Sequence, residues 1–293
     1  MKKKAIFIIN PNSGVGRHKT VEKDIEKYFD TNIFEYKIIY TEYQGHAIEI
    51  SKQAVTDNID LLVISGGDGS INEVSQSLVN TNTVLGLIPT GSGNGLARFL
   101  EIPLQPHKAI GLLNTYRIKE IDTAEVNNKL FVSIAGVGFD ALIAEKFTKV
   151  HRRGFFSYFS LITTAFTTYV PQEYTLTLDE KKIKRKALFI SFANSNQFGY
   201  NTNIAPDAII DDGKLVVTIV EKPPLILTPI LAHLLFFKKI NQSNYVEVIK
   251  SNNISIERKD NGVVNIDGEA IHINSKSLNF KIKNKSLKII VPK

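Results

Sequence analysis

The first 120 residues alternate short apolar runs with segments whose apolar side chains recur at helical spacing. Runs such as Leu61–Ile64, bounded by turn residues, are typical of strands that are buried on both faces of a sheet. Strands are predicted at 4–9, 34–40, 61–64 and 84–88, and helices at 19–29, 45–54, 71–79 and 95–100. Because strands and helices alternate, we predict an α/β domain with a parallel sheet covered by helices on both faces.

The pattern changes near Ile121, and β-type segments dominate the rest of the chain. Turn pairs such as Asp212-Gly213 and Asp267-Gly268 separate these segments, which is typical of antiparallel hairpins. Strands are predicted at 129–135, 174–178, 186–193, 215–220, 245–249, 253–257, 263–266 and 278–291, with helical insertions at 139–169 and 224–240. We therefore predict an antiparallel β-sandwich as the second domain.

The change of pattern divides the chain into domains of residues 1–122 and 123–293, each long enough to bury its own core. It leaves open whether the last strand, residues 285–293, returns to the first domain. With 43% hydrophobic and 22% charged residues the composition is that of a globular protein, and the lack of Cys excludes disulfides and thiolate chemistry. The longest apolar stretch, Leu225–Phe237, has 13 residues, whereas a membrane-spanning helix needs about 20.

The excess positive charge lies in the second half of the chain. Residues 1–122 carry 13 Lys and Arg against 14 Asp and Glu, and residues 123–293 carry 23 against 15. Such a field suits nucleic acid, an anionic membrane surface or a phosphorylated substrate, and it suits equally a basic face kept for solubility. Charge alone does not choose among these partners.

Three glycine-rich turns follow predicted strands of the first domain, at 10–14, 66–70 and 89–94. In an open α/β sheet, ligands bind outside the carboxyl ends of the strands, where such turns meet. Glycines let the backbone approach a phosphate closely, and the N–H groups at a helix start favour negative charge. The turns match neither the Walker A pattern nor the dinucleotide-binding fingerprint, and a single turn of this kind often needs glycine for geometry alone. Together they predict a phosphate-binding edge.

These turns resemble the diacylglycerol kinase catalytic-domain family, which includes bacterial lipid kinases and the sphingosine and ceramide kinases. Asn72-Glu73 after the second turn and Ala97-Arg98 after the third agree with that family. Further motifs stand in the family's order in the second half: 136–140, 193–194, 204–208, 211–213 and 267–269. The resemblance implies a nucleotide-binding α/β domain similar to those of phosphofructokinase and NAD kinase, followed by a β-sandwich that contributes to a lipid site.

The resemblance also implies which residues bind ATP and Mg²⁺ and which are catalytic. Asp68, between two glycines, matches a carboxylate that holds Mg²⁺ against ATP or orients the acceptor hydroxyl, although an Asp there also favours a turn. Glu269 matches the base that takes the proton from the lipid hydroxyl, although Asp-Gly-Glu is also a common hairpin turn. The positions that match the family's ATP site are Asn10, Pro11, Asn12, Ser13, Gly14, Thr41, Gly67, Asp68, Gly69, Ser70, Ile71, Asn72, Glu73 and Ser92.

A structural Mg²⁺ site is implied at Asp212, with the main-chain carbonyls of Ile209 and Lys214. One carboxylate with carbonyls and waters suits a hard cation, and Asp-Asp-Gly is also a routine turn. The chain departs from many diacylglycerol kinases at Gly95, where those enzymes have Asp. The third turn is closer to those of the sphingosine and ceramide kinases, so the acceptor lipid is left open.

The function expected from these residues is an ATP-dependent lipid kinase that phosphorylates diacylglycerol or a related glycerolipid or sphingoid lipid. The alternatives are a soluble-metabolite kinase of the NAD kinase type and a non-catalytic lipid-binding regulatory protein. The turns at 10–14 and 89–94 favour a lipid kinase over the NAD kinase type. A non-catalytic protein would be expected to have lost Asp68 or Glu269, and both are present.

The expected partners are a lipid substrate and an anionic membrane surface, with no nucleic acid, and a homodimer is left open. Arg152 and Arg153 stand among aromatic residues, and Lys238 and Lys239 follow an apolar helix. Basic and apolar side chains together favour reversible binding at a bilayer surface. We therefore expect a cytoplasmic protein that binds peripherally at the inner face of the membrane.

Overall fold

The structure is a computed structural model that describes residues 2–13, 18–148, 155–199 and 202–292. The chain forms two compact units. Unit 1 comprises Met1–Asp122 and Asn284–Lys293, and unit 2 comprises Thr123–Lys283. Strands β5 (Ile118–Val126) and β18 (Ser277–Ile290) each begin in one unit and end in the other.

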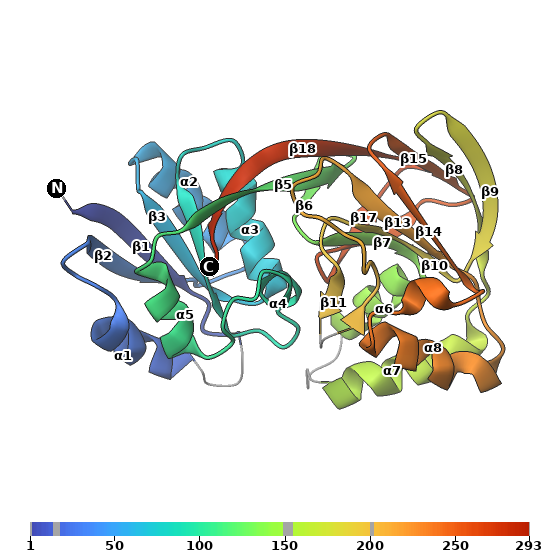
Figure 1. Cartoon of the computed structure of the whole chain (residues 1–293), viewed down its shortest axis with the longest axis horizontal. Helices are drawn as coiled ribbons and strands as arrows, with labels where there is room; N and C mark the ends of the chain where they lie inside the picture. Colours follow the sequence, from blue (N-terminus) through green and yellow to red (C-terminus); the bar gives the residue numbers. More distant parts are fainter. Residues whose placement is uncertain (1, 14–17, 149–154, 200–201, 293) are drawn as a thin grey trace. The chain divides into compact units, whose positions relative to one another are not determined.

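Unit 1 is built on a parallel sheet with the strand order β2-β1-β3-β4 (Figure 1). Its strands are β1 (Lys3–Ile9), β2 (Phe34–Tyr40), β3 (Leu61–Gly66) and β4 (Val84–Pro89). The end of β18 returns beside β4, where Ile289 pairs in parallel with Leu85. Strands β3 and β4 are buried throughout, as their unbroken apolar sequences predict.

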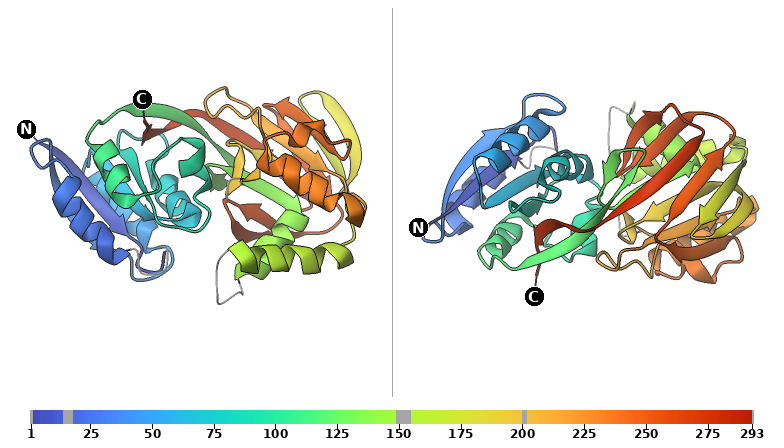
Figure 2. Two further views of the ribbon diagram at one scale, coloured as in Figure 1. Left: turned by 60° about the horizontal axis from the view of Figure 1, so that its bottom comes forward. Right: turned by 90° about the horizontal axis from the view of Figure 1, so that it is seen from above.

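Helices cover both faces of this sheet (Figures 1 and 2). One face packs against α1 (His18–Tyr28) and α5 (Pro106–Leu113), and α2 (His46–Thr56) and α3 (Asp68–Leu78) pair on the other. Phe7 of β1 meets Phe29, just after α1, edge to face with their ring centroids 4.8 Å apart. The short helix α4 (Gly95–Phe99) follows the turn after β4. This is the α/β layer that the sequence predicts.

Unit 2 contains two antiparallel sheets with a shared apolar core. In the first, β18 pairs with β5 and β15, and the order continues to β8 and β9; in the second, the order is β14-β13-β10-β7-β16-β17. The bounds of the remaining strands are β6 (Lys129–Phe131), β7 (Ile134–Gly138), β8 (Gln172–Leu178), β9 (Lys181–Ala187), β10 (Phe189–Ala193), β13 (Leu215–Val220), β14 (Val246–Ser251), β15 (Ile254–Arg258), β16 (Gly262–Ile266) and β17 (Glu269–Ile273). A two-stranded ribbon of β11 (Gln197–Gly199) and β12 (Thr202–Asn203) stands apart.

Three helices cover the outer face of the second sheet (Figure 2). They are α6 (Phe139–Thr148), α7 (Phe155–Thr168) and α8 (Thr228–Phe236), the last flanked by short 3₁₀ turns η1 (Leu225–Leu227) and η2 (Ile240–Gln242). None of the helices in the described part of the chain combines the length and the apolar sequence that a membrane-spanning helix requires.

The predicted fold class, a parallel α/β domain followed by an antiparallel sandwich, is confirmed. Details within it differ. The strand predicted at 186–193 is two strands, β9 and β10, and the strand predicted at 129–135 is split into β6 and β7. The first helical insertion contains α6 and α7 as separate helices. Helix α5 was not predicted.

The buried Arg258 joins the ends of three strands in unit 2. Its guanidinium donates to the carbonyl oxygens of Ile273 at 2.8 Å, Ser275 at 2.9 Å and Gly262 at 3.1 Å. Burial lowers the pKa of this guanidinium. The charged side chain therefore satisfies the buried carbonyl of Ile273 and the part-buried carbonyls of Gly262 and Ser275.

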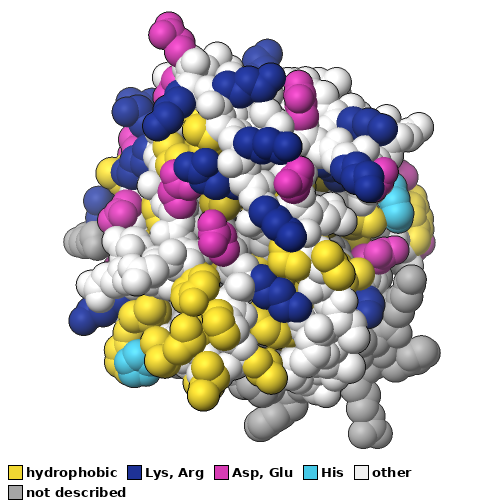
Figure 3. All heavy atoms as spheres, turned by 90° about the vertical axis from the view of Figure 1, so that its right-hand side faces the viewer, with side chains coloured by type: hydrophobic (Ala, Val, Ile, Leu, Met, Phe, Trp, Pro, Cys, Tyr) yellow, Lys and Arg dark blue, Asp and Glu magenta, His cyan; other side chains and the backbone are white. Residues whose placement is uncertain are grey.

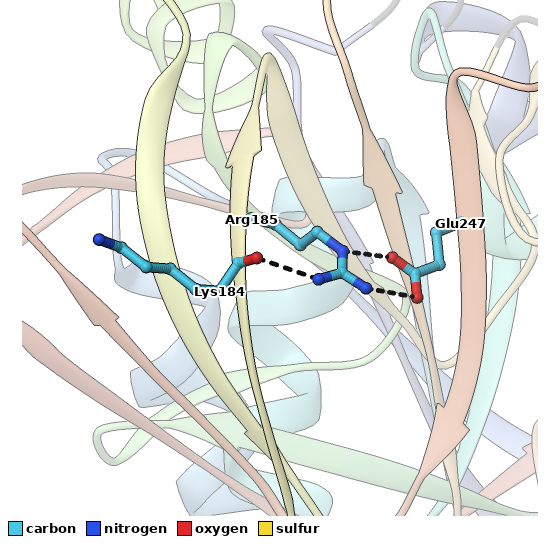
Figure 4. A network of polar contacts seen from close by, with 3 residues as sticks. All are labelled: Lys184, Arg185 and Glu247. Atoms are coloured by element: carbon cyan, nitrogen blue, oxygen red, sulfur yellow. Dashed lines mark hydrogen bonds and ion pairs between the residues drawn. The ribbon is translucent and has the colours of Figure 1, made fainter.

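We expect Arg258→Met to lower the free energy of unfolding by about 2–3 kcal/mol, because one buried and two part-buried carbonyls lose a charged donor. Arg185→Met is the matched control. Arg185 forms a two-pronged ion pair with Glu247, at 2.8 Å and 3.2 Å, in a part of the surface where both side chains are partly exposed (Figure 4). Exposed ion pairs contribute little, so the control should change stability by less than about 1 kcal/mol. Chemical denaturation measures both, and equal losses would contradict this role for Arg258.

Candidate functional site

The loop that follows β1 is tied to the other two glycine-rich loops by side chains. The amide Nδ2 of Asn10 donates to Ser70 Oγ at 2.9 Å, and its Oδ1 accepts from the N–H of Asn12 at 3.0 Å. Ser13 Oγ lies 2.7 Å from Thr90 Oγ1. The first loop therefore contacts the loop after β3 through Asn10 and the loop after β4 through Ser13.

The second and third loops meet backbone to backbone. Both Thr90 and Gly91 donate their N–H groups to the carbonyl of Gly66, at 3.0 Å and 3.2 Å. A Cβ atom on Gly91 would lie 2.5 Å from the Cα atom of Gly67, closer than real Cβ contacts allow. Glycine is required at this position because two main chains touch there. The carboxyl ends of β1, β3 and β4 thus form one connected edge.

Asp68 lies at the first position of α3, directly after Gly67. Its Oδ1 accepts from the N–H of Leu96 in α4 at 3.4 Å. A carboxylate at a helix N-terminus is favoured by the helix dipole. The contact orients Asp68 along the edge that the glycine loops form.

Other residues predicted for the ATP site surround this edge in different ways. The N–H of Thr41, after β2, donates to the carbonyl of Ile9 at 3.0 Å. Glu73 Oε1 accepts from the N–H of Gly45 at 3.1 Å, and burial raises the pKa of the Glu73 carboxyl. Ile71 is 2% exposed and belongs to the core, whereas Ser92 is exposed at the tip of its loop. Gly14 lies outside the described residues.

Two buried oxygen atoms at this edge accept no hydrogen bond from any residue that the structure describes: Ser65 Oγ and Asn94 Oδ1. Asn94 has a left-handed backbone with φ of 52°, and its Nδ2 donates to the carbonyl of Gly91 at 2.8 Å. A buried polar atom without a partner is costly unless a ligand or water completes it. Close backbone approach, short polar side chains and a helix N-terminus together fit a phosphate-bearing ligand such as ATP.

In unit 2, Glu269 directly follows a two-residue hairpin turn. Asp267 and Gly268 make the turn with φ of 48° and 90°, and Ile266 pairs with Glu269 across it. The Asp267 carboxylate is buried and accepts hydrogen bonds from the N–H groups of Val132 at 2.8 Å, Ser133 at 2.8 Å and Ile134 at 3.0 Å. Asp267 is therefore occupied with holding the turn, and half-buried Glu269 is the carboxylate that the turn presents.

A second buried carboxylate, that of Asp140, supports the same turn. This contribution is not apparent from the sequence. Asp140 Oδ2 accepts from Asn265 Nδ2 at 2.9 Å, and Asn265 Oδ1 accepts from the N–H of Gly268 at 3.0 Å. Gly136 leaves room for the carboxylate, since a Cβ there would lie 1.9 Å from Asp140 Oδ2. Burial raises the pKa of Asp140 to about 6, while the bond from Asn265 lowers it. Only the fold could pair Asn265 with Asp140, which is 125 residues away.

The positions predicted for a structural Mg²⁺ lie in the turn before β13. Asp212 Oδ1 accepts from the N–H of Lys214 at 3.1 Å, and Asp212 Oδ2 lies 3.7 Å from Lys250 Nζ. Ile209 is exposed in the same turn. In the described part of the chain no group of three or more His, Cys, Asp or Glu side chains could hold a metal. Any ion here would depend on one carboxylate and main-chain carbonyls.

Two family descriptions match the chain along most of its length. The diacylglycerol kinase catalytic domain matches residues 4–126, and the YegS C-terminal NAD kinase beta sandwich-like domain matches residues 133–291. The chain belongs to the diacylglycerol kinase family.

Relatives agree with this membership. The chain is 26% identical over 275 residues to a diacylglycerol kinase of Staphylococcus saprophyticus, covering 92% of this chain and 90% of the relative. It is 27% identical to a diacylglycerol kinase of Bacillus subtilis, covering 91% and 90%. A crystal structure of a diacylglycerol kinase from Bacillus anthracis has the same fold, with a TM-score of 0.77, 20% identity and coverage of 99% and 97%.

The contact between Gly67 and Gly91 should affect the stability of this protein. We expect Gly91→Ala to lower the free energy of unfolding by about 1–3 kcal/mol, because the added methyl group forces two main chains apart. Gly111→Ala in α5 is the matched control, since a Cβ there meets nothing within 4 Å. That change should raise stability by about 0.5–1 kcal/mol. Denaturant titration distinguishes them, and a neutral Gly91→Ala would contradict the contact.

Asp140 gives the stability of this protein a predicted pH dependence. Its pKa is higher in the folded state than in the unfolded chain, so its contribution to stability is present at low pH and is lost as pH rises through about 6. As the pH rises from about 5 to about 7.5, the free energy of unfolding of the parent should fall by about 1 kcal/mol relative to that of Asp140→Asn. Urea denaturation of both proteins across pH measures this difference. A difference that does not vary with pH would contradict the burial of an ionisable carboxyl at this position.

Proposed function

We propose that the chain is an ATP-dependent lipid kinase that transfers the γ-phosphoryl group to a lipid hydroxyl, with diacylglycerol as the first candidate. The observation that carries the proposal is the connected edge of unit 1, where Gly67 and Gly91 touch and the loops after β1, β3 and β4 are hydrogen-bonded together. The names of the relatives support the choice of acceptor.

Nucleotide binding is assigned to the loops of unit 1 and the residues next to them. Main-chain N–H groups and short side chains would contact the phosphates, and the buried Ser65 hydroxyl could donate to an acceptor on the ligand. The buried Oδ1 of Asn94 can only accept, so its partner would be a water or an N–H or O–H group of the nucleotide. The proposed positions are Asn10, Pro11, Asn12, Ser13, Gly14, Thr41, Gly67, Asp68, Gly69, Ser70, Ile71, Asn72, Glu73 and Ser92. Ile71, buried in the core, could contribute only its main chain.

Phosphoryl transfer asks the protein for positioning and for stabilisation of charge. ATP supplies the phosphoryl group, and Mg²⁺ offsets the negative charge of the triphosphate. Asp68, oriented by the N–H of Leu96, is proposed to hold the metal or to orient the acceptor hydroxyl. Glu269, presented by the Asp267-Gly268 turn, is proposed to accept the hydroxyl proton as the oxygen attacks.

A structural Mg²⁺ in unit 2 remains a proposal on the donor chemistry alone. The carboxylate of Asp212 and the carbonyls of Ile209 and Lys214 are oxygen ligands of the kind that Mg²⁺ prefers. Asp212 already faces Lys250, so the ion would have to replace the lysine as the partner of this carboxylate.

Transfer of radiolabel from ATP tests the proposal against its alternatives. The acceptors are diacylglycerol, monoacylglycerol, sphingosine, ceramide, phosphatidylglycerol and NAD. Labelling of diacylglycerol or another of these lipids supports a lipid kinase and names its acceptor. Labelling of NAD alone would favour a soluble-metabolite kinase. Binding of lipid without transfer to any acceptor would favour a non-catalytic regulatory protein.

We expect Glu269→Gln to slow turnover at saturating ATP by about 10²–10⁴-fold and to leave ATP affinity nearly unchanged. Asp68→Asn should also lower turnover. Unlike Glu269→Gln, it should weaken Mg²⁺-ATP binding if Asp68 holds the metal. Glu257→Gln is the control, because Glu257 is an exposed glutamate of β15 and its change removes the same charge. Steady-state kinetics and calorimetric ATP titration separate the two effects. Unchanged turnover in folded Glu269→Gln would place the base elsewhere.

A further inference from the structure

The segment that comprises η1, α8 and the residue after α8 exposes apolar side chains where a protein surface usually carries polar ones. Ile226 is 83% exposed, Leu225 63% and Phe237 61%. We define the α8 surface as Leu225, Ile226, Ile230, Phe236 and Phe237, all of which are exposed. Figure 3 shows hydrophobic side chains gathered in the lower part of this face of unit 2, with lysine or arginine side chains at their border.

The opposite side of α8 already packs on the protein. Leu231, Leu234 and Leu235 contact the apolar cluster between the helices and the second sheet. The α8 surface is therefore not the part of the helix that the fold needs for its core. His233 is also exposed on α8, and its ring centroid lies 4.2 Å from that of Phe237. The exposed side is otherwise mostly apolar, and contiguous exposed apolar side chains mark a binding face.

The charges around the α8 surface indicate what that environment is. Lys222 precedes it and Lys238 and Lys239 follow it, and no Asp or Glu occurs from 222 to 246. Lys222 Nζ is held by the carbonyl of Tyr169 at 2.8 Å, and Lys238 and Lys239 are exposed. Apolar side chains that are flanked along the chain by these lysines complement a surface that is apolar beneath a layer of negative charge.

We propose that the α8 surface inserts into the headgroup region of an anionic lipid bilayer. Lys238 and Lys239 contact the anionic headgroups while Ile226, Ile230 and Phe237 enter the acyl boundary. The inference rests on the proposed function in one respect, because it gives a lipid kinase a means of reaching an acceptor that resides in the membrane.

The backbone of Lys238 supports a role for its charge. Lys238 has φ of 59°, and the N–H of Lys239 donates to the carbonyl of Leu234 at 2.9 Å, so Lys238 occupies the left-handed position that ends the helix. Glycine is favoured at this position, because any side chain there is strained. The chain has a lysine where the fold alone would favour glycine.

Vesicle co-sedimentation of the full chain, without ATP, tests the proposal. The vesicles contain equal parts of phosphatidylglycerol and phosphatidylcholine, or phosphatidylcholine alone. The parent should bind the anionic vesicles, and binding should weaken as salt rises. Lys238→Gln with Lys239→Gln should lower the partition coefficient by about tenfold to thirtyfold, and Ile226→Ser with Ile230→Ser by about tenfold or more.

Matched controls separate this surface from general charge and hydrophobicity. Lys181→Gln with Lys182→Gln removes the same charge from exposed β9, and Ile118→Ser changes an exposed isoleucine at the start of β5. Both should bind as the parent does. Lys238→Gly guards against a folding defect, because it relieves the left-handed strain: its melting temperature should stay or rise while vesicle binding falls.

Three results would overturn the proposal. The first is equal binding of the parent to neutral and anionic vesicles, and the second is unchanged vesicle binding of both α8 double variants. The third is that the parent is a dimer, and that Ile226→Ser with Ile230→Ser dissociates this dimer without affecting vesicle binding. Phosphorylation of a short-chain diacylglycerol below its critical micelle concentration is measured in parallel. The α8 variants should retain this activity, so loss of vesicle binding and failure of the proposed kinase function give different results.

Discussion

The close approach of Gly67 and Gly91 is the constraint on which the site in unit 1 depends. Parallel strands deliver their carboxyl ends to one edge, but that alone leaves loops beside one another without fixing them. Because neither glycine has a side chain, the main chains touch and the N–H groups of Thr90 and Gly91 reach the carbonyl of Gly66. Asn10 and Ser13 then tie the first loop to this pair. The edge is thereby set before any ligand arrives, which lowers the entropy cost of binding.

In unit 2, the turn before the candidate base Glu269 is held by buried polar side chains. The Asp267 carboxylate takes main-chain N–H groups from the segment before β7, and Asn265 links Asp140 to Gly268. Such a network is favourable only while every member has its partners. Glu269 directly follows the turn that this network holds, and it is half-buried.

The sequence was sufficient for what depends on local pattern. Fully apolar Leu61–Ile64 predicted a buried parallel strand, and the Asp267-Gly268 pair predicted its hairpin, since both signals are carried by adjacent residues. Strand β9, with the sequence KKIKRKA, was mostly missed because only Ile183 and Ala187 of it are buried and its charges suggest a loop. The partners of Arg258 and the pairing of Asn265 with Asp140 join residues that only tertiary structure brings together. The glycine loops were found by pattern, but the contact of Gly67 with Gly91 was not.

Amide chemical-shift mapping shows whether the three loops of unit 1 form one nucleotide-binding edge. ATP with Mg²⁺ is titrated into isotopically labelled protein, and shifts are followed residue by residue. We expect saturable changes concentrated at residues 10–13, 67–73 and 90–96, which appear together at one affinity because the loops are connected. Changes at only one loop, or changes confined to unit 2 at saturating ATP, would contradict it.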